Sequence, residues 1–310
     1  MPDFYYFCKP INNQAPQSNT FYRIYMTLLR TIIILLTLIP AIGINAASPW
    51  QTRFHDEDAD TAAITALLNE VAAVDGLDAS GRISLFAHKL AGKPYVANTI
   101  EGTPEQLTVN MAEFDCTTFV ETVMALAMTL ESGRNSWMDF LYNLEKIRYR
   151  GGHVNGYGSR LHYISDWIID NAHRGNFEEV TSKIGHPSYI VKTIDFMSTH
   201  RDKYPALADD AEYQTIKNME VGYRSHRFPV IKPHDLKRAQ LREGDVVAMA
   251  TNIKGLDTQH IGIVTMTGGV PHLLHASSKA GKVIIDPLPL SEYLRKNRSI
   301  VGIRVIRLKD

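Results

Sequence analysis

Apolar residues recur at helical spacing through the first part of the chain, whereas the last part alternates short apolar runs with turn residues. The helical spacing predicts helices over 59–76, 80–91, 114–133, 136–150, 163–173 and 189–200. Runs rich in valine and isoleucine predict an antiparallel meander of strands over 245–251, 260–267, 272–277, 282–288 and 300–308. Helices first and strands last predict the α+β fold class.

Local signals refine some boundaries and leave others open. Ser80 is a candidate N-cap for its helix, and Gly92 a candidate stop. Residues 93–102 are expected to be extended, because Pro94 disfavours a helical residue before it. The segment 203–237 is polar and irregular, and no element is predicted there.

The N-terminal region has the anatomy of a secretory signal peptide. Arg30 precedes an apolar run over 31–43, and Ile44-Asn45-Ala46 fits a cleavage site. The run is shorter than the roughly 20 residues that a spanning helix needs, although an uncleaved membrane anchor stays an alternative. We expect a signal peptide over about 26–46, export to the periplasm, and Met26 as the true start, with 1–46 an extension outside the folded domain.

Charge and cysteine content exclude several classes of protein. The chain has 33 lysines and arginines against 33 acidic residues, so it lacks the basic excess that binds nucleic acid. Its two cysteines, Cys8 and Cys116, exclude a disulfide scaffold and a thiolate-rich zinc site. Removal of the signal peptide would leave Cys116 as the single thiol of an exported protein, exposed to oxidation unless it is buried or reactive.

Cys116 falls in the first turn of a predicted helix. Asp115 is a favoured N-cap residue, and Gly133 a natural terminator of this almost wholly apolar segment, which we expect to be central and buried. Backbone N–H groups and the helix dipole at such a position stabilise a thiolate. The same N–H groups are able to hold a developing oxyanion.

Two histidines are predicted to share one face of a hairpin. Gly268-Gly269 suits a two-residue turn, which places Thr267 opposite Val270 and Gly262 opposite His275. Because side chains alternate along a strand, His260 then lies diagonally across from His275. We expect Gly262 to leave room for the cysteine helix, and His272, of opposite parity, to point away. A cysteine and an imidazole oriented by a third polar group form the usual thiol hydrolase site.

At these residues the chain resembles the NlpC-type papain-like cysteine hydrolases of bacterial cell walls. The matching segments span about 190 residues in the family's order: Gly92-Lys93-Pro94-Tyr95, Asp115-Cys116-Thr117, Gly244-Asp245, His260-Ile261-Gly262-Ile263 and His275-Ala276-Ser277. The resemblance implies a papain-like fold in which Cys116 is the nucleophile, His260 the general base and acid, and His275 the residue that orients His260. It also implies that the Tyr95 hydroxyl assists the Cys116 backbone N–H at the oxyanion site.

Departures from the common pattern favour a narrower branch of that superfamily. Asn98-Thr99 replaces the usual Gly-Gly, and more than 100 residues separate the cysteine helix from the Gly-Asp strand. These features resemble N-acetylmuramoyl-L-alanine amidases, which cut the muramyl amide of peptidoglycan fragments, preferentially those with anhydromuramyl ends. The resemblance implies one amidase domain over 47–310 with a helical insert at about 132–242, no cofactor or metal, and muropeptides as binding partners.

Four residues are candidates for substrate binding. Arg160, His162 and Tyr163 lie at the predicted start of the helix over 163–173, where backbone donors and an aromatic face suit the amides and hydroxyls of a sugar. Asp115 is both a cap and a candidate contact. A core position for Trp167, and an ion pair of Arg160 with Asp166, are the alternatives at this helix.

Three other readings remain open. The same triad with another pocket would make an endopeptidase that cuts the γ-D-glutamyl-diaminopimelate bond of the stem peptide. A catalytically silent wall-binding module is the second. A zinc hydrolase is the third, but the chain has no His-Glu-x-x-His motif, and His272 and His275 have opposite parity.

Overall fold

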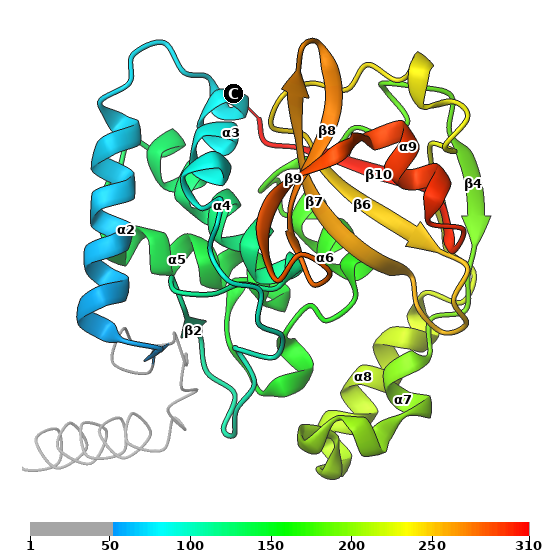
Figure 1. The fold of residues 1–310 in the computed structure, drawn as a ribbon. Helices are drawn as coiled ribbons and strands as arrows, with labels where there is room; N and C mark the ends of the chain where they lie inside the picture. The colour runs from blue at the N-terminus through cyan, green and yellow to red at the C-terminus, as the bar shows by residue number, and fades with distance from the viewer. Residues whose placement is uncertain (1–51, 310) are drawn as a thin grey trace, which may run out of the picture. The chain divides into compact units, whose positions relative to one another are not determined.

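The computed structural model describes residues 52–309 (Figure 1). The predicted signal peptide and the choice between Met1 and Met26 fall outside these residues. None of the helices formed by these residues combines the length and the hydropathy of a membrane-spanning segment.

The first part of the described chain is helical, as the periodicity predicts. Four helices pack together there: α2 (Glu57–Ala72), α3 (Ala79–Lys89), α4 (Cys116–Glu131) and α5 (Trp137–Arg148). Asp115 caps α4, which confirms the predicted start, and Gly133 follows its end with a φ of 72°. The cap of α3 is Asp78, not Ser80, because the Asp78 carboxylate accepts a hydrogen bond from Gly81 N–H at 2.7 Å.

Short strands and a further helix connect these helices to the rest of the chain. Strands β1 (Arg53–Phe54) and β2 (Thr108–Val109) pair in parallel beside α2. Helix α6 (Ile164–His173) lies where the sequence predicts it, and a short edge strand, β3 (Glu178–Glu179), follows.

The C-terminal part forms a six-stranded sheet in the order β3-β10-β6-β7-β8-β9. Its long strands are β6 (Val246–Thr251), β7 (Thr258–Thr267), β8 (Val270–Ser277), β9 (Lys282–Pro289) and β10 (Ile300–Arg307). Strands β6 to β9 form the predicted meander. The last strand departs from it, because helix α9 (Leu290–Lys296) carries the chain back so that β10 pairs with β6. All contacts between neighbouring strands of this sheet are antiparallel.

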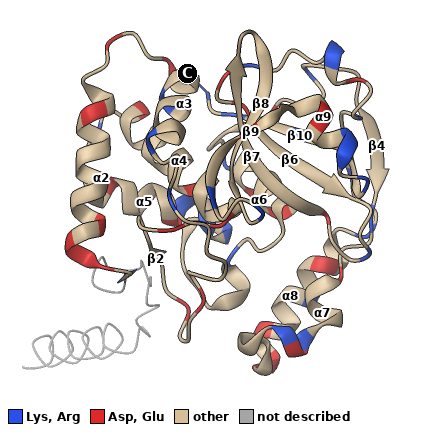
Figure 2. Ribbon diagram, in the orientation of Figure 1, with Lys and Arg blue, Asp and Glu red and all other residues tan. Residues whose placement is uncertain are grey.

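The sheet separates two apolar layers. Alternate residues of its strands, such as Ile261 and Ile263 of β7, pack against α4 and the other N-terminal helices. The side chains on the other face of the sheet, including Val264 of β7, pack with Leu290 and Leu294 of α9. Strands β6, β7 and β8 carry no lysine, arginine, aspartate or glutamate, and Figure 2 shows these charges on the surrounding helices and loops.

The segment between α6 and the sheet differs from prediction. Residues 189–200, expected to be helical, form strand β4 (Ser188–Val191) and the single turn α7 (Phe196–Thr199). The irregular segment 203–237 contains helix α8 (Asp210–Gly222) and strand β5 (Arg227–Val230), which pairs with β4. Tyr189 and Val191 are exposed, and their alternation with Ile190 is the strand period that the helical reading missed.

A buried ion pair joins α4 to α5. Arg148 donates to the Glu121 carboxylate at 2.6 Å and to the carbonyl of Thr108 at 2.6 Å, and both charged side chains are 3% exposed. Burial raises the pKa of Glu121, although Arg148 opposes the shift. The helix that carries Cys116 therefore depends on a charge pair that solvent does not reach.

We expect Arg148→Met to lower the free energy of unfolding by about 3–5 kcal/mol, because it leaves the Glu121 carboxylate buried without its cation. Urea unfolding measures the loss. The double variant Glu121→Gln/Arg148→Met should recover much of it, since no charge then remains to be buried. A loss below about 1 kcal/mol in the single variant would mean that the pair behaves as a surface ion pair.

Candidate active site

The first residue of α4 is Cys116, and a capping box holds it there. The Asp115 carboxylate accepts from Thr118 N–H at 2.8 Å, and the Thr118 hydroxyl oxygen accepts from Asp115 N–H at 2.9 Å. Every residue of α4 from Thr118 to Thr129 is buried, which confirms the predicted central helix. Cys116 itself is partly exposed at the end of this rigid element.

The hairpin of β7 and β8 has the predicted register. Gly268 and Gly269 have φ values of 58° and 79°, as the two-residue turn requires, and Thr267 pairs with Val270. In this register His260 Nε2 lies 2.6 Å from His275 Nδ1, with the two rings nearly perpendicular at 87°. The hairpin therefore brings the two predicted histidines into direct contact.

Gly262 has a different role from the one predicted. A Cβ atom built at this glycine would approach Leu273 Cδ1 at 2.8 Å and His275 Cβ at 3.0 Å, both on β8. The neighbours of Gly262 in β7, Ile261 and Ile263, are the residues that pack toward α4. The missing side chain thus makes room for His275, not for the cysteine helix.

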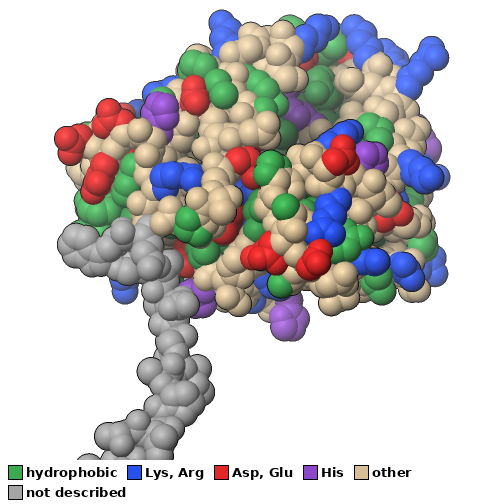
Figure 3. All heavy atoms as spheres, turned by 90° about the horizontal axis from the view of Figure 1, so that it is seen from below, with side chains coloured by type: hydrophobic (Ala, Val, Ile, Leu, Met, Phe, Trp, Pro, Cys, Tyr) green, Lys and Arg blue, Asp and Glu red, His purple; other side chains and the backbone are tan. Residues whose placement is uncertain are grey.

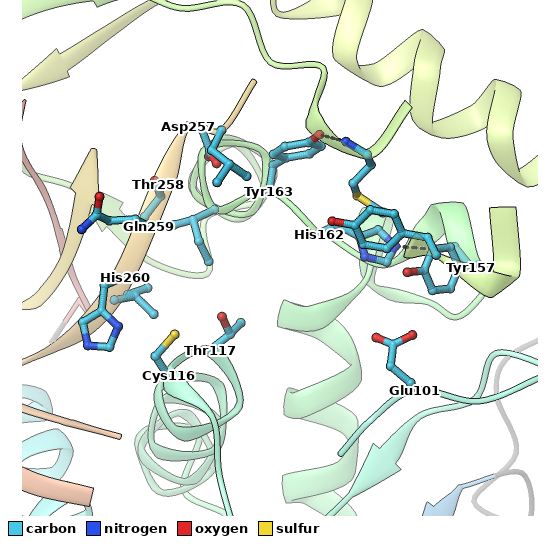
Figure 4. A pocket seen from close by; sticks show the side chains of 15 residues that line it. Glu101, Cys116, Thr117, Tyr157, His162, Tyr163, Asp257, Thr258, Gln259 and His260 are labelled. Carbon is cyan, nitrogen blue, oxygen red and sulfur yellow. Dashed lines mark hydrogen bonds between the residues drawn. The ribbon is translucent and has the colours of Figure 1, made fainter. Parts of the chain in front are cut away.

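Cys116 and His260 meet at one end of a pocket of about 210 Å³. Figure 4 shows the imidazole beside the sulfur, with Thr117 next to them and the opening extending toward Glu101 and Tyr157. His275 engages Nε2 of His260, so Nδ1 is the ring nitrogen left for Cys116. The face drawn in Figure 3 is hollowed, and a histidine side chain is visible inside the hollow.

The electrostatics of the pair favour two neutral groups. Burial raises the pKa of the Cys116 thiol to about 11, and the Asp115 carboxylate adds to the shift, while the N–H of Ile261 opposes it. Burial and the neighbouring His275 lower the pKa of His260 to about 3. Burial thus opposes the thiolate that the helix N-terminus favours.

Tyr95 is close to the nucleophile, as the resemblance implies. It lies in the extended segment after α3, where its N–H donates to Gly281 O at 2.9 Å and it forms a parallel bridge with Phe114. Burial raises the pKa of its phenol, and Cys116 and Asp115 add to the shift. A protonated Tyr95 is a hydrogen-bond donor on the Cys116 side of the site.

The four substrate-binding candidates divide into two pairs. His162 and Tyr163 line the pocket, although each is already hydrogen-bonded: His162 Nε2 lies 2.9 Å from Tyr157 O, and the Tyr163 hydroxyl donates to Glu220 at 2.8 Å. Asp115 and Arg160 are not among the residues that line it. Asp115 serves as the cap of α4, so its expected substrate contact has no support from its position.

Arg160 has a structural environment. Its side chain is 5% exposed, pairs with Glu101 at 2.8 Å and Glu105 at 3.5 Å, and lies over the Tyr157 ring at 4.8 Å. Although burial alone would lower its pKa, Glu105 and Glu101 keep the pKa of Arg160 above its ordinary value. Asp166, the alternative ion-pair partner of Arg160, pairs instead with Arg150 at 2.5 Å.

A backbone N–H group at the start of α6 is already hydrogen-bonded within the protein. The Asp257 carboxylate, from the loop before β7, accepts from Ser165 N–H at 2.5 Å, and burial raises the pKa of Asp257. The helix begins at Ile164, and Trp167 is 1% exposed in the core. The backbone donors predicted for a sugar at this helix are therefore partly used by Asp257.

Several residues of the site were not predicted from the sequence. Glu101, Tyr157, Tyr204, Asp257 and Gln259 line the pocket, and Tyr293 and Asp286 surround the histidine pair. Tyr293 packs edge-on to His275 with ring centroids 5.6 Å apart, and burial raises its pKa to about 12, with Asp286 and Cys116 contributing. One sequence signal could have identified Asp286: the alternation of side chains along β8 and β9, which places Asp286 on the same face of the sheet as His275. No three histidine, cysteine, aspartate or glutamate residues within 52–309 are grouped as a metal site.

Comparison with solved structures finds bacterial proteins that share this α+β fold, one of them described as an amidase. An N-acetylmuramoyl-L-alanine amidase from Bacteroides uniformis is 35% identical, with a TM-score of 0.70 over 75% of this chain and 99% of that chain. A structure described as a candidate xylanase of Bacteroides fragilis is 36% identical, with a TM-score of 0.68 over 73% of this chain and 100% of that chain.

The chain belongs to the AmiA-like family, described as N-acetylmuramoyl-L-alanine amidase-like, whose model matches residues 85–303. The resemblance to the narrower amidase branch is thereby confirmed. A Legionella pneumophila protein of the DUF1460 family shares the fold, at 21% identity and a TM-score of 0.63 over 82% of this chain and 96% of that chain. A search of curated proteins finds no significant match.

We expect alkylation of Cys116 by iodoacetamide to be slow at pH 7 and to rise about tenfold per pH unit until about pH 11, because only the thiolate reacts and burial raises the thiol pKa. Mass spectrometry of the labelled Cys116 peptide of the mature protein measures the rate. A rate that is already constant below pH 8 would show a preformed thiolate instead.

Proposed function

We propose that this protein is a thiol-dependent amidase that hydrolyses the N-acetylmuramoyl-L-alanine bond of peptidoglycan fragments, with anhydromuropeptides as the preferred substrates. The observation that carries the proposal is the pocket in which Cys116, at the start of α4, lies beside His260, whose far nitrogen contacts His275 at 2.6 Å. Membership of an amidase-like family supports the bond type. The packing of the cysteine helix against the histidine-bearing sheet supports the papain-like arrangement that the resemblance implies.

The neutral resting pair sets the order of the proton transfers. As the Cys116 sulfur attacks the lactyl amide carbonyl, its proton passes to Nδ1 of His260, so thiolate and imidazolium form only along the reaction path. His260 then gives that proton to the departing nitrogen of L-alanine, and the carbon–nitrogen bond breaks. A water molecule that transfers a proton to His260 hydrolyses the thioester and restores the thiol.

Two groups are suited to the charge that develops on the carbonyl oxygen. The backbone N–H of Cys116 belongs to the first turn of α4 and has no partner within the helix. The Tyr95 phenol stays protonated because its pKa is raised, so it can donate a second hydrogen bond. His275 holds the imidazole of His260 in the orientation that leaves Nδ1 free.

The aromatic lining of the pocket supports a sugar on the acyl side of the scissile bond. Tyr157, Tyr163 and Tyr204 surround the space next to Cys116, and aromatic rings pack well against the apolar faces of saccharides. We assign His162 and Tyr163 to this surface. Arg160 acts indirectly, because it stacks on Tyr157 and fixes Glu101 at the pocket edge.

A cell-wall substrate agrees with export. We propose that residues 26–46 direct the chain to the periplasm and that the cut follows Ala46. N-terminal sequencing of protein recovered from the periplasmic fraction tests this. Recovery of a membrane-bound product that retains the apolar run would favour the anchored alternative.

We expect the wild-type protein to release L-alanyl stem peptides from disaccharide-anhydro muropeptides faster than from muropeptides with reducing ends. Cys116→Ala should lose at least about 10³-fold in rate while its unfolding transition is unchanged, because the nucleophile is removed from a helix that remains intact. Mass spectrometry of the products identifies the bond that opens, and Met138→Ala, at an exposed position of α5, is the matched control.

Other product patterns have distinct meanings. Release of a diaminopimelate-containing fragment, with the muramyl amide intact, would make the protein an endopeptidase. Turnover that survives Cys116→Ala but stops with a chelator would replace the thiol mechanism with metal-assisted hydrolysis. No turnover by the wild-type protein on any muropeptide would favour a wall-binding module.

A further inference from the structure

A carboxylate lies behind the histidine pair, on the side away from the cysteine. Asp286, in strand β9, places Oδ2 3.7 Å from Nε2 of His275, and the two side chains are 15% and 3% exposed. Nε2 of His275 is a buried nitrogen without a hydrogen-bond partner. At 3.7 Å the carboxylate lies next to the neutral imidazole just beyond hydrogen-bond distance, and a small side-chain rotation would close the gap.

The orientation of the Asp286 carboxylate is fixed by its own strand. Its other oxygen, Oδ1, accepts a hydrogen bond from Leu288 N–H at 2.9 Å, so the side chain cannot turn freely toward solvent. The carbonyl of Asp286 also lies 3.0 Å from Nδ1 of His272, which ties β9 to β8 at this point. One oxygen is thus held by the backbone while the second is directed at the unpartnered nitrogen of His275.

We propose that Asp286 is a positioning residue, the fourth member of a line Cys116–His260–His275–Asp286 that selects the tautomers of both imidazoles. This inference rests on the proposed thiol mechanism. A carboxylate accepts but does not donate, so it favours the proton of His275 on Nε2. Nδ1 of His275 then accepts the proton of His260 Nε2, which leaves Nδ1 of His260 as the bare base beside Cys116.

The surroundings of the pair make this selection necessary. His275 faces His260 from β7, Asp286 from β9 and Tyr293 from α9, while Cys116 of α4 lies on the far side of His260. Of these groups, Asp286 is the acceptor next to His275 Nε2. With the opposite tautomer, His275 would donate to His260 Nε2, and the proton of His260 would occupy the nitrogen that must receive the thiol proton.

The charge of Asp286 also acts during turnover. When His260 takes the thiol proton, the resulting imidazolium can share its charge with His275, and a carboxylate beyond that ring stabilises the shared charge. Asp286 needs no proton of its own for this role. It lowers the barrier of the step in which the imidazolium forms and leaves the neutral resting pair in place.

The test compares Asp286→Asn with the matched variant Asp78→Asn. The substitution at position 286 keeps the shape of the side chain and an oxygen for Leu288 N–H, but it removes the carboxylate. Asp78 likewise accepts a backbone hydrogen bond, from Gly81 N–H at 2.7 Å, at the cap of α3. Two readouts are recorded for each: steady-state hydrolysis of anhydromuropeptide, and the nitrogen-15 chemical shifts of the His275 ring, which distinguish the two tautomers without substrate.

We expect Asp286→Asn to lower kcat about tenfold or more with KM changed less than about twofold, and to move His275 away from the single Nε2–H tautomer of the wild type. Asp78→Asn should change neither. A wild-type His275 protonated on Nδ1, or an Asp286→Asn variant with wild-type tautomers and kcat, would overturn the proposal. If the wild type cleaves no muropeptide, the chemical shifts still decide the role of Asp286, so the two proposals fail separately.

Discussion

The register of the β7–β8 hairpin is the constraint on which the site depends. A turn of two glycines with positive φ, Gly268 and Gly269, allows the strands to close without an inserted residue. A slip of one position would turn His275 toward α4 and bring Leu274 to His260. The same slip would place every buried residue of β8 on the wrong face, so the free energy of the apolar core holds the histidines in place.

The central helix supplies the second half of the geometry. Helix α4 is buried along most of its length and is tied to α5 by the Glu121–Arg148 pair, so its first residue has little freedom to move. Its N-terminus reaches the backbone of β7 at Ile261, next to His260. The packing that makes the position rigid also raises the pKa of the Cys116 thiol, although the residue stays partly exposed. The rigidity of the position and the raised pKa of its thiol are consequences of one arrangement.

Sequence patterns were sufficient to predict an element where a single hydrophobic period, helical or strand-like, dominated its segment. The apolar run of α4, the Asp115 cap and the glycine turn each follow from local chemistry, and together they predicted the contact of His260 with His275. The prediction of a helix over 189–200 was wrong because the apolar pattern of Tyr189, Ile190 and Val191 is compatible with both the helical and the strand period. Pairing with the distant strand β5 decided in favour of a strand. The position of β10 beside β6 was also not local, since it depends on α9 crossing the sheet.

The pocket residues were harder to predict because their roles are set by partners far along the chain. Arg160 looks like a ligand-binding cation in the sequence, yet Glu101 and Glu105, 59 and 55 positions earlier, hold it inside the protein. Asp257 likewise occupies the start of α6 from 92 residues away. In the proposed function a substrate meets the tyrosines and His162, while Arg160 supports the Tyr157 ring from behind. On that proposal, specificity depends on the shape of an aromatic surface, because the cation next to it, Arg160, is already held by Glu101 and Glu105 and is not available to the substrate.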